Sequence, residues 1–197
     1  ACAISYHDDK DICYNSIKKL TDRGMSQVNM HFVLSENSYQ DALSVMRDMK
    51  TDSRLAKMNA IVLLSLKKKG RAANSNDKPI SQDKYMRLID CAFENDIKFG
   101  CDSCGSTKFL NYFDFVQVKD DLRECVEPCE SSCFSAYVDV DGMYYPCSFC
   151  EKANEEWGEG INVIDSDFMK DVWHCEKTSK FRNNLLKNNR NCPIYKV

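Results

Sequence analysis

The stretch "NAIVLLSL", residues 59–66, is an almost unbroken apolar run bounded by polar residues. Such a run is typical of a parallel β-strand that is buried on both faces. Before it, "CAISYH" (2–7) and "QVNMHFVLS" (27–35) have strand-like patterns. After it, "IKFG" (97–100) predicts a fourth, short strand. Helical patterns separate these strands, at 12–23, 39–50 and 82–96. The alternation predicts an α/β fold with a parallel sheet, with ligands bound at the carboxyl ends of the strands.

Composition excludes several classes of protein. The chain has 197 residues and a formal net charge of −3, which argues against a nucleic-acid-binding protein. The basic run Lys67–Lys69, with Arg71, is expected to be a solvated strand end. No stretch reaches the roughly 20 apolar residues that a membrane span needs. No leader peptide is visible, so we expect a cytoplasmic protein, and the absent initiator Met together with the unpaired strand at 2–7 suggests a fragment of a longer one.

The twelve cysteines are unevenly distributed: nine of them lie between Cys101 and Cys192. In a reducing compartment, clustered cysteines are more often metal ligands than disulfides. Within this region, "SAYVDV" (135–140) and "MYYPC" (143–147) flank Asp141-Gly142, a strong signal for a hairpin with a type I′ turn. We therefore predict two domains, an α/β domain over residues 1–100 and a small cysteine-rich α+β domain with a β-hairpin over residues 101–197.

Two sets of cysteines compete as ligands. The pairs Cys101-x2-Cys104 and Cys147-x2-Cys150 have the spacing of a tetrahedral zinc site. Alternatively, the hairpin brings Cys129 and Cys147 together, with further ligands from the "CDSC" loop and from Cys192, whose Cys-Pro step also closes ferredoxin-type cluster motifs.

The spacing of Cys129, twelve residues, Gly142, four residues, Cys147 resembles the opening of the auxiliary-cluster domain, called SPASM or in its shorter form twitch, of radical S-adenosylmethionine (SAM) enzymes. "VNMHFVLSENSYQDALSVM" and "NAIVLLSLKKKGRA" are similar to strand regions of the partial (β/α) barrel of that family. The resemblance implies half of such a barrel over 1–100 and a twitch-like domain with one auxiliary [4Fe–4S] cluster over 101–197. It implies as ligands Cys104, Cys129, Cys147 and Cys192, with Cys101 and Cys150 as alternates.

One departure from the family concerns the SAM cluster. The family's Cys-x3-Cys-x2-Cys motif is absent, since Cys125-x3-Cys129 is followed by Ser132 where the third ligand would fall. SAM and a second [4Fe–4S] cluster are therefore expected only in an intact protein that includes a missing N-terminal half. By resemblance, that enzyme would cleave SAM reductively and abstract hydrogen from a substrate, with peptides and proteins among the candidates. The alternative is a non-catalytic domain that binds an Fe–S cluster or structural zinc and interacts with a partner protein.

Six polar residues are candidates for a substrate or SAM pocket. Alternation along the strand at 27–35 places Asn29 and His31 on one face, and a hydrogen-bonded core histidine is the competing interpretation. The other candidates lie on the first strand or near the carboxyl end of the strand at 59–66, where a solvated charge run is the competing interpretation: Ser5, His7, Ser65 and Arg71.

Overall fold

The computed structural model describes residues 1–7, 9–117 and 120–195. Contacts divide the chain into two compact units. Unit 1 comprises Ala1–Leu66 with Asn76–Val126, and unit 2 comprises Lys67–Ser75 with the described chain from Glu127 to Tyr195. This division differs from the boundary expected at residue 100, because that residue lies within the strand Phe99–Cys101, and the helix Ser106–Val116 that follows also belongs to unit 1.

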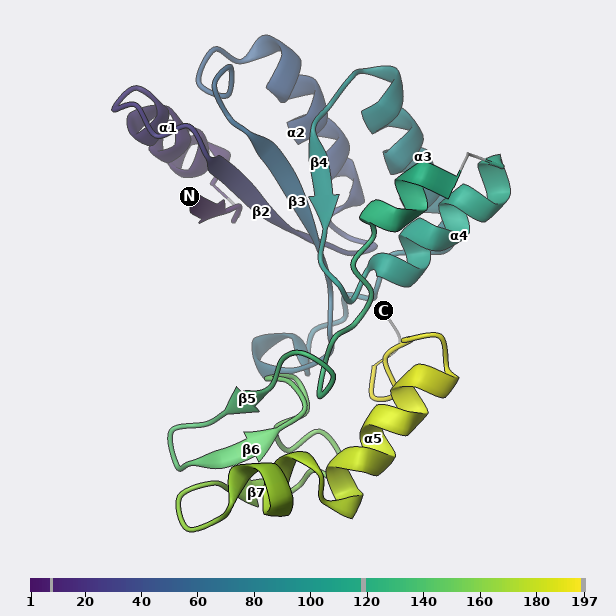
Figure 1. Ribbon diagram of the computed structural model, residues 1–197. Coiled ribbons are helices and arrows are strands. Elements are labelled where there is room, and N and C mark those ends of the chain that lie inside the picture. The colour runs from purple at the N-terminus through teal and green to yellow at the C-terminus, as the bar shows by residue number, and fades with distance from the viewer. Residues whose placement is uncertain (8, 118–119, 196–197) are drawn as a thin grey trace. The chain divides into compact units, whose positions relative to one another are not determined.

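Unit 1 is built on a parallel sheet in the order β1-β2-β3-β4 (Figure 1). The strands are β1 (Cys2–Ser5), β2 (Val28–Leu34), β3 (Ala60–Ser65) and β4 (Phe99–Cys101), and the helices between them are α1 (Lys10–Thr21), α2 (Tyr39–Thr51) and α3 (Gln82–Glu94). The predicted α/β fold with four parallel strands is confirmed. Strand order follows chain order, so right-handed crossovers place successive helices on the same face of the sheet.

Only that one face of the sheet is well buried. Along β2, the side chains of alternate residues are fully buried, whereas Asn29 and His31 are half-buried and Val33 is exposed. In β3, Ile61 and Leu63 are buried while Val62 and Leu64 are half-buried. The prediction that the strand at 59–66 is buried on both faces is therefore wrong, because the helices of unit 1 all pack on the other side.

Local sequence explains the ends of several elements. The Asp9 carboxylate caps α1 by accepting from the backbone N–H groups of Asp11 and Ile12, at 2.9 and 3.3 Å.

After β4, the chain forms α4 (Ser106–Val116), which packs its aromatic side against the neighbouring elements. The rings of Phe109 on α4 and Phe99 on β4 meet edge to face at 5.6 Å. These contacts hold α4 within unit 1.

Unit 2 contains a small antiparallel sheet of β5 (Tyr137–Val138), β6 (Met143–Tyr145) and β7 (Ile161–Asn162), with the π-helix η3 (Phe168–Trp173) and α5 (Glu176–Lys187). Two short 3₁₀ segments, η1 (Gly70–Ala72) in unit 2 and η2 (Asp120–Cys125) in unit 1, complete the elements. The buried core of unit 2 includes Tyr144, Tyr145, Trp157, Phe181 and Leu185.

The predicted hairpin is present as β5 and β6, but its turn is not of type I′. Gly142 has φ +75°, whereas Asp141 does not adopt a positive φ. Instead, the Asp139 carboxylate accepts from the N–H groups of Asp141 and Met143, both at 2.9 Å. This side-chain bond makes a wider connection in which only the glycine needs the left-handed region.

None of the helices in the described part of the chain is long and apolar enough to cross a membrane.

Candidate functional site

Two cysteines follow β6 in a turn and lie against each other. The Sγ atoms of Cys147 and Cys150 are 3.5 Å apart. Cys150 is almost completely buried, and Cys147 packs against the same core. Pro146, which cannot continue the β6 ladder, precedes the pair in the sequence. The turn thus presents two thiols side by side at the end of the hairpin.

Two more cysteines of unit 2 lie near this pair. The Cys129 thiol donates to the Ser131 hydroxyl at 3.2 Å, and the Cys192 sulfur accepts from the backbone N–H of Tyr195 at 3.3 Å. Burial raises the pKa of the Cys192 thiol, and the nearby Cys129 and Cys147 raise it further. Cys192 in turn raises the pKa of the Cys150 thiol. Cys129, Cys147, Cys150 and Cys192 are therefore electrostatic neighbours, although they come from three separate segments.

The thiols of Cys147 and Cys150 differ in pKa. The hydrogen bond from the Cys150 thiol lowers the pKa of Cys147, and the backbone N–H groups of Phe149 and Cys150 act in the same direction. The same bond raises the pKa of Cys150, and burial adds to this effect. Cys147 is thus the more acidic thiol of the pair, and the thiolate is the form that binds metal ions.

The four cysteines provide sulfur donors suited to a metal centre, but the described side chains are not arranged around one metal position. Among the residues that the structure describes, no group of three or more His, Cys, Asp and Glu side chains is placed to hold a metal ion. None of the twelve cysteines forms a disulfide in the structure. The four clustered thiols can act as soft ligands for zinc or an iron–sulfur cluster, provided that they draw together around it.

Basic residues brace the turn that carries the cysteine pair. The Lys69 ammonium donates to the backbone carbonyls of Ser148 and Glu151, both at 2.7 Å. The Lys67 ammonium lies 4.6 Å from the centre of the Phe149 ring. Lys67 is only 8% exposed and Lys69 donates to two carbonyls, so the expectation of a solvated strand end is wrong for these two lysines, whereas Arg71 is exposed as expected. Nothing in the local sequence reveals these contacts, because they join residues about eighty positions apart.

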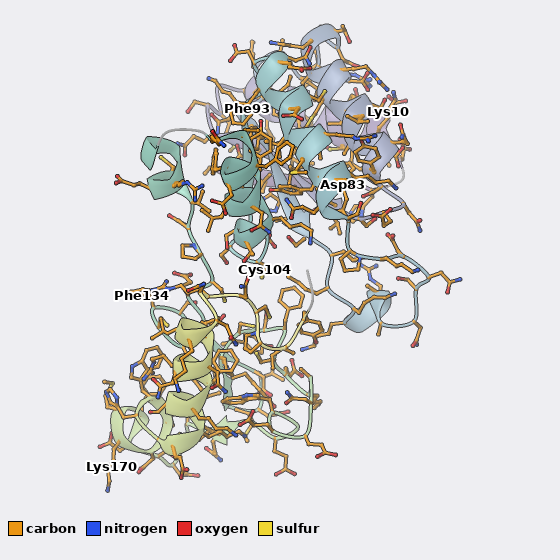
Figure 2. The ribbon with its side chains drawn as sticks, turned by 90° about the vertical axis from the view of Figure 1, so that its right-hand side faces the viewer. Lys10, Asp83, Phe93, Cys104, Phe134 and Lys170 are labelled. Atoms are coloured by element: carbon orange, nitrogen blue, oxygen red, sulfur yellow. The ribbon has the colours of Figure 1, made fainter. Side chains whose placement is uncertain are left out.

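The remaining predicted ligands belong to unit 1. Cys104 lies in the turn between β4 and α4 (Figure 2). Cys101 ends β4, and burial raises the pKa of its thiol to about 11. The four clustered thiols thus include three of the predicted ligands and the alternate Cys150, all within unit 2.

The structure separates the six pocket candidates. Strand register places Ser5 next to His31, and Ala3 next to Asn29, across β1 and β2. Asn29 accepts a hydrogen bond from the Asn59 side chain at 2.8 Å on the half-exposed face of the sheet. Asn29 and His31 thus lie on one accessible face, as the alternation predicted.

The other three candidates lie elsewhere. His7 is exposed after the end of β1, and Arg71 is exposed in η1 of unit 2. Ser65 is engaged in the structure, since its hydroxyl donates to the Asp102 carboxylate at 3.0 Å.

Comparison with protein-family models, with curated proteins and with solved structures found no match for this chain.

Proposed function

We propose that unit 2 binds a [4Fe–4S] cluster through Cys129, Cys147, Cys150 and Cys192. The observation that carries the proposal is the gathering of these four thiols from three segments of the chain. This ligand set replaces Cys104 of the family-based expectation by Cys150, which lies beside Cys147 within one unit.

The surroundings of the sulfurs suit such a cluster. Iron–sulfur clusters are held by thiolates, and N–H donors to the sulfurs tune their reduction potential. Here the Tyr195 N–H points at Cys192, and the N–H groups of Phe149 and Cys150 favour the thiolate of Cys147. Both Cys129 and Cys150 are buried, which would shield a cluster from water. When bound, the cluster would anchor a substrate or relay an electron.

By the resemblance stated above, we further propose that the chain is the C-terminal part of a radical SAM enzyme. Support comes from the sequential strand order and the accessible sheet face that carries Asn29, His31 and Ser5, as expected for half of a partial barrel. SAM and its own cluster would need ligands outside these residues, because the Cys-x3-Cys-x2-Cys motif is absent. A peptide or protein remains one candidate substrate.

A structural zinc site is the second candidate, and the spacing of the cysteine pair favours it. Two thiolates on one tetrahedral zinc ion lie about 3.8 Å apart when each Zn–S bond is about 2.3 Å long. The 3.5 Å between Cys147 and Cys150 is close to that value. Thiolates on different irons of a cubane point away from one another, so a [4Fe–4S] cluster would require this pair to separate.

Metal analysis of the anaerobically purified chain distinguishes the two. The cluster predicts a brown protein with about four irons and matching sulfide per chain. Zinc predicts a colourless protein with one zinc. The variant Cys150→Ser should lose most of the metal, whereas Cys104→Ser and Cys175→Ser should keep it. Retention of metal by Cys150→Ser, with loss from Cys104→Ser, would instead support the ligand set implied by the resemblance.

A further inference from the structure

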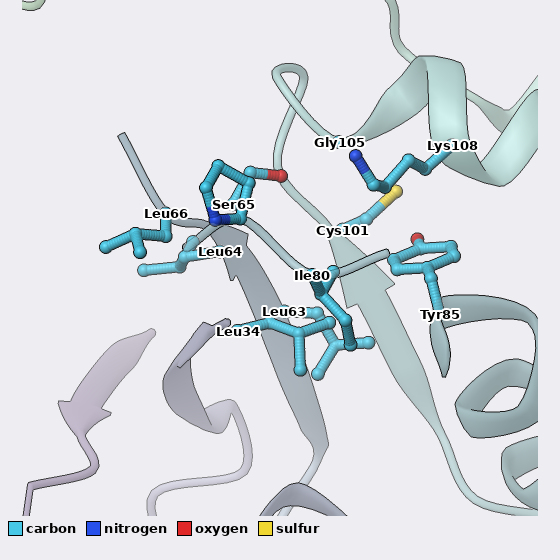
Figure 3. Close-up of a pocket in the computed structure, with 11 residues that line it drawn as sticks. Leu34, Leu63, Leu64, Ser65, Leu66, Ile80, Tyr85, Cys101, Gly105 and Lys108 are labelled. Atoms are coloured by element: carbon cyan, nitrogen blue, oxygen red, sulfur yellow. The ribbon is translucent and has the colours of Figure 1, made fainter. Parts of the chain in front are cut away.

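A pocket lies within unit 1 and is lined by residues of that unit alone. It opens at the carboxyl ends of β3 and β4, on the face of the sheet that the helices cover (Figure 3). Leu34, Leu63 and Ile80 give it an apolar wall, and Tyr85, Cys101 and Lys108 contribute polar atoms. Leu34 and Leu63 are on the opposite side of their strands from Asn29 and His31. The pocket is thus separate from the accessible sheet face.

The hydroxyl of Tyr85 is a buried polar group without a partner. Tyr85, on α3, is only 2% exposed, and its hydroxyl has no hydrogen-bond partner among the described residues. The Cys101 thiol lies near it but outside hydrogen-bonding geometry. Burial, above all, raises the pKa of this hydroxyl, so it is a neutral donor. An unsatisfied buried hydroxyl costs stability, which a bound acceptor would restore.

Lys108 supplies a positive charge at the same pocket. It lies on the first turns of α4 and is half-buried, and no described carboxylate forms an ion pair with its ammonium. The carboxylate of Asp102 instead accepts from Ser65 and from the N–H of Gly105. A partly desolvated cation beside a free hydroxyl donor and an apolar wall has the chemistry that binds an anion with an apolar tail.

We propose that this pocket binds a small monocarboxylate with a short alkyl chain. Its carboxylate would accept from the Tyr85 hydroxyl and the Lys108 ammonium, and its chain would lie along Leu34, Leu63 and Ile80. The free volume is about 10 Å³, the room of one water molecule, within a space of about 280 Å³ that includes the open mouth. The carboxylate head therefore takes the room of one water, and the alkyl chain runs from the apolar wall toward the mouth. This site goes beyond the proposed function and does not depend on it.

Methyl NMR of the full chain with butyrate as the probe tests the site. With ¹³C-labelled Leu and Ile methyl groups, butyrate should shift Ile80, Leu34 and Leu63 in a saturable manner. The methyl groups of Ile12, which is 68% exposed on α1, should not move. Butan-1-ol has a similar alkyl chain but no charge, and it should bind at least about tenfold more weakly, since charge-assisted hydrogen bonds are the stronger ones.

Three variants separate the contributions. Lys108→Met should weaken butyrate binding roughly tenfold or more, and the matched change Lys98→Met, at an exposed lysine of the same unit, should leave it unchanged. Tyr85→Phe should weaken binding several-fold without lowering the Tm, because the removed hydroxyl has no partner in the free protein.

Equal binding of butyrate and butan-1-ol would overturn the proposal, as would non-saturable shifts or equal losses from Lys108→Met and Lys98→Met. A fall in Tm for Tyr85→Phe would show that its hydroxyl is already partnered, and this too would overturn the argument.

Discussion

Gly105, which precedes α4, is closely packed against the end of β3. A Cβ atom at this position would lie 2.7 Å from Ser65 Oγ and 3.1 Å from Asp102 Oδ1. Ser65 cannot move away freely, because its hydroxyl donates to Asp102 at 3.0 Å. Overpacking of this kind costs about 1–3 kcal/mol, so Gly105→Ala should lower the free energy of unfolding by about 2 kcal/mol.

A double-mutant cycle isolates the contact. Ser65→Ala alone should cost about 1 kcal/mol through its hydrogen bond. Ser65→Ala with Gly105→Ala should also cost about 1 kcal/mol instead of the additive value of about 3, because the nearer of the two oxygens is gone. Gly100→Ala is the matched control, since nothing lies within 4 Å of its Cβ position, and it should change stability by less than about 0.5 kcal/mol.

Urea unfolding followed by two probes provides the measurement. The only two tryptophans, Trp157 and Trp173, are in unit 2, so their fluorescence follows unit 2, whereas far-UV circular dichroism also follows the helices of unit 1. Gly105→Ala should shift the circular dichroism transition more than the fluorescence transition. Additive losses in the double variant, or a loss from Gly100→Ala as large as that from Gly105→Ala, would refute the reasoning.

Three further predictions concern single polar contacts. Hydrogen bonds from Lys84 and from the backbone N–H of Ser81 lower the pKa of Glu36 from 4.5 to about 2. Its stabilising contribution is thus complete above about pH 4.5 and lost as the pH falls toward 2, and Glu36→Gln should remove this part of the acid dependence in urea unfolding across a pH series. Asp9→Ala should lower the free energy of unfolding by about 1 kcal/mol through its lost helix cap, while Asp9→Asn, which keeps an acceptor, should cost much less. Lys69→Met removes two hydrogen bonds to backbone carbonyls about eighty residues away and should destabilise unit 2 by about 1–2 kcal/mol, read by tryptophan fluorescence. Lys68→Met should have a smaller effect, because the Lys68 ammonium donates only to Ser75, within the same short segment.

The strand and helix pattern of unit 1 could be predicted from periodicity, because each strand is a short apolar run between polar caps. Periodicity could not predict that only one face of the sheet would be well buried. Val62 and Leu64 are as apolar as Ile61 and Leu63, and only the positions of the helices decide which pair is fully covered. Apolar composition therefore overstated the burial of β3.

The candidate metal site was predictable only in part. The hairpin spacing singled out Cys129 and Cys147, and the structure places both near Cys192. The role of Cys150 could not be predicted, because it depends on how the turn after β6 folds the Cys150 thiol against that of Cys147. The bracing by Lys69 depends on tertiary contacts across about eighty residues, for which the sequence carries no local signal.

The inclusion of Lys67–Ser75 in unit 2 has a consequence for how the protein can be divided. Within residues 1–195, the described polypeptide passes between the units three times, so no single cut yields either unit as a continuous fragment. A fragment that starts at Glu127 would lack Lys67 and Lys69 and the contacts they make with the cysteine turn. Complementation of that fragment by a peptide covering residues 67–75 would then be the way to restore it. Because of the segment Lys67–Ser75, each unit packs around its own core, but neither unit is encoded by one continuous stretch of the gene.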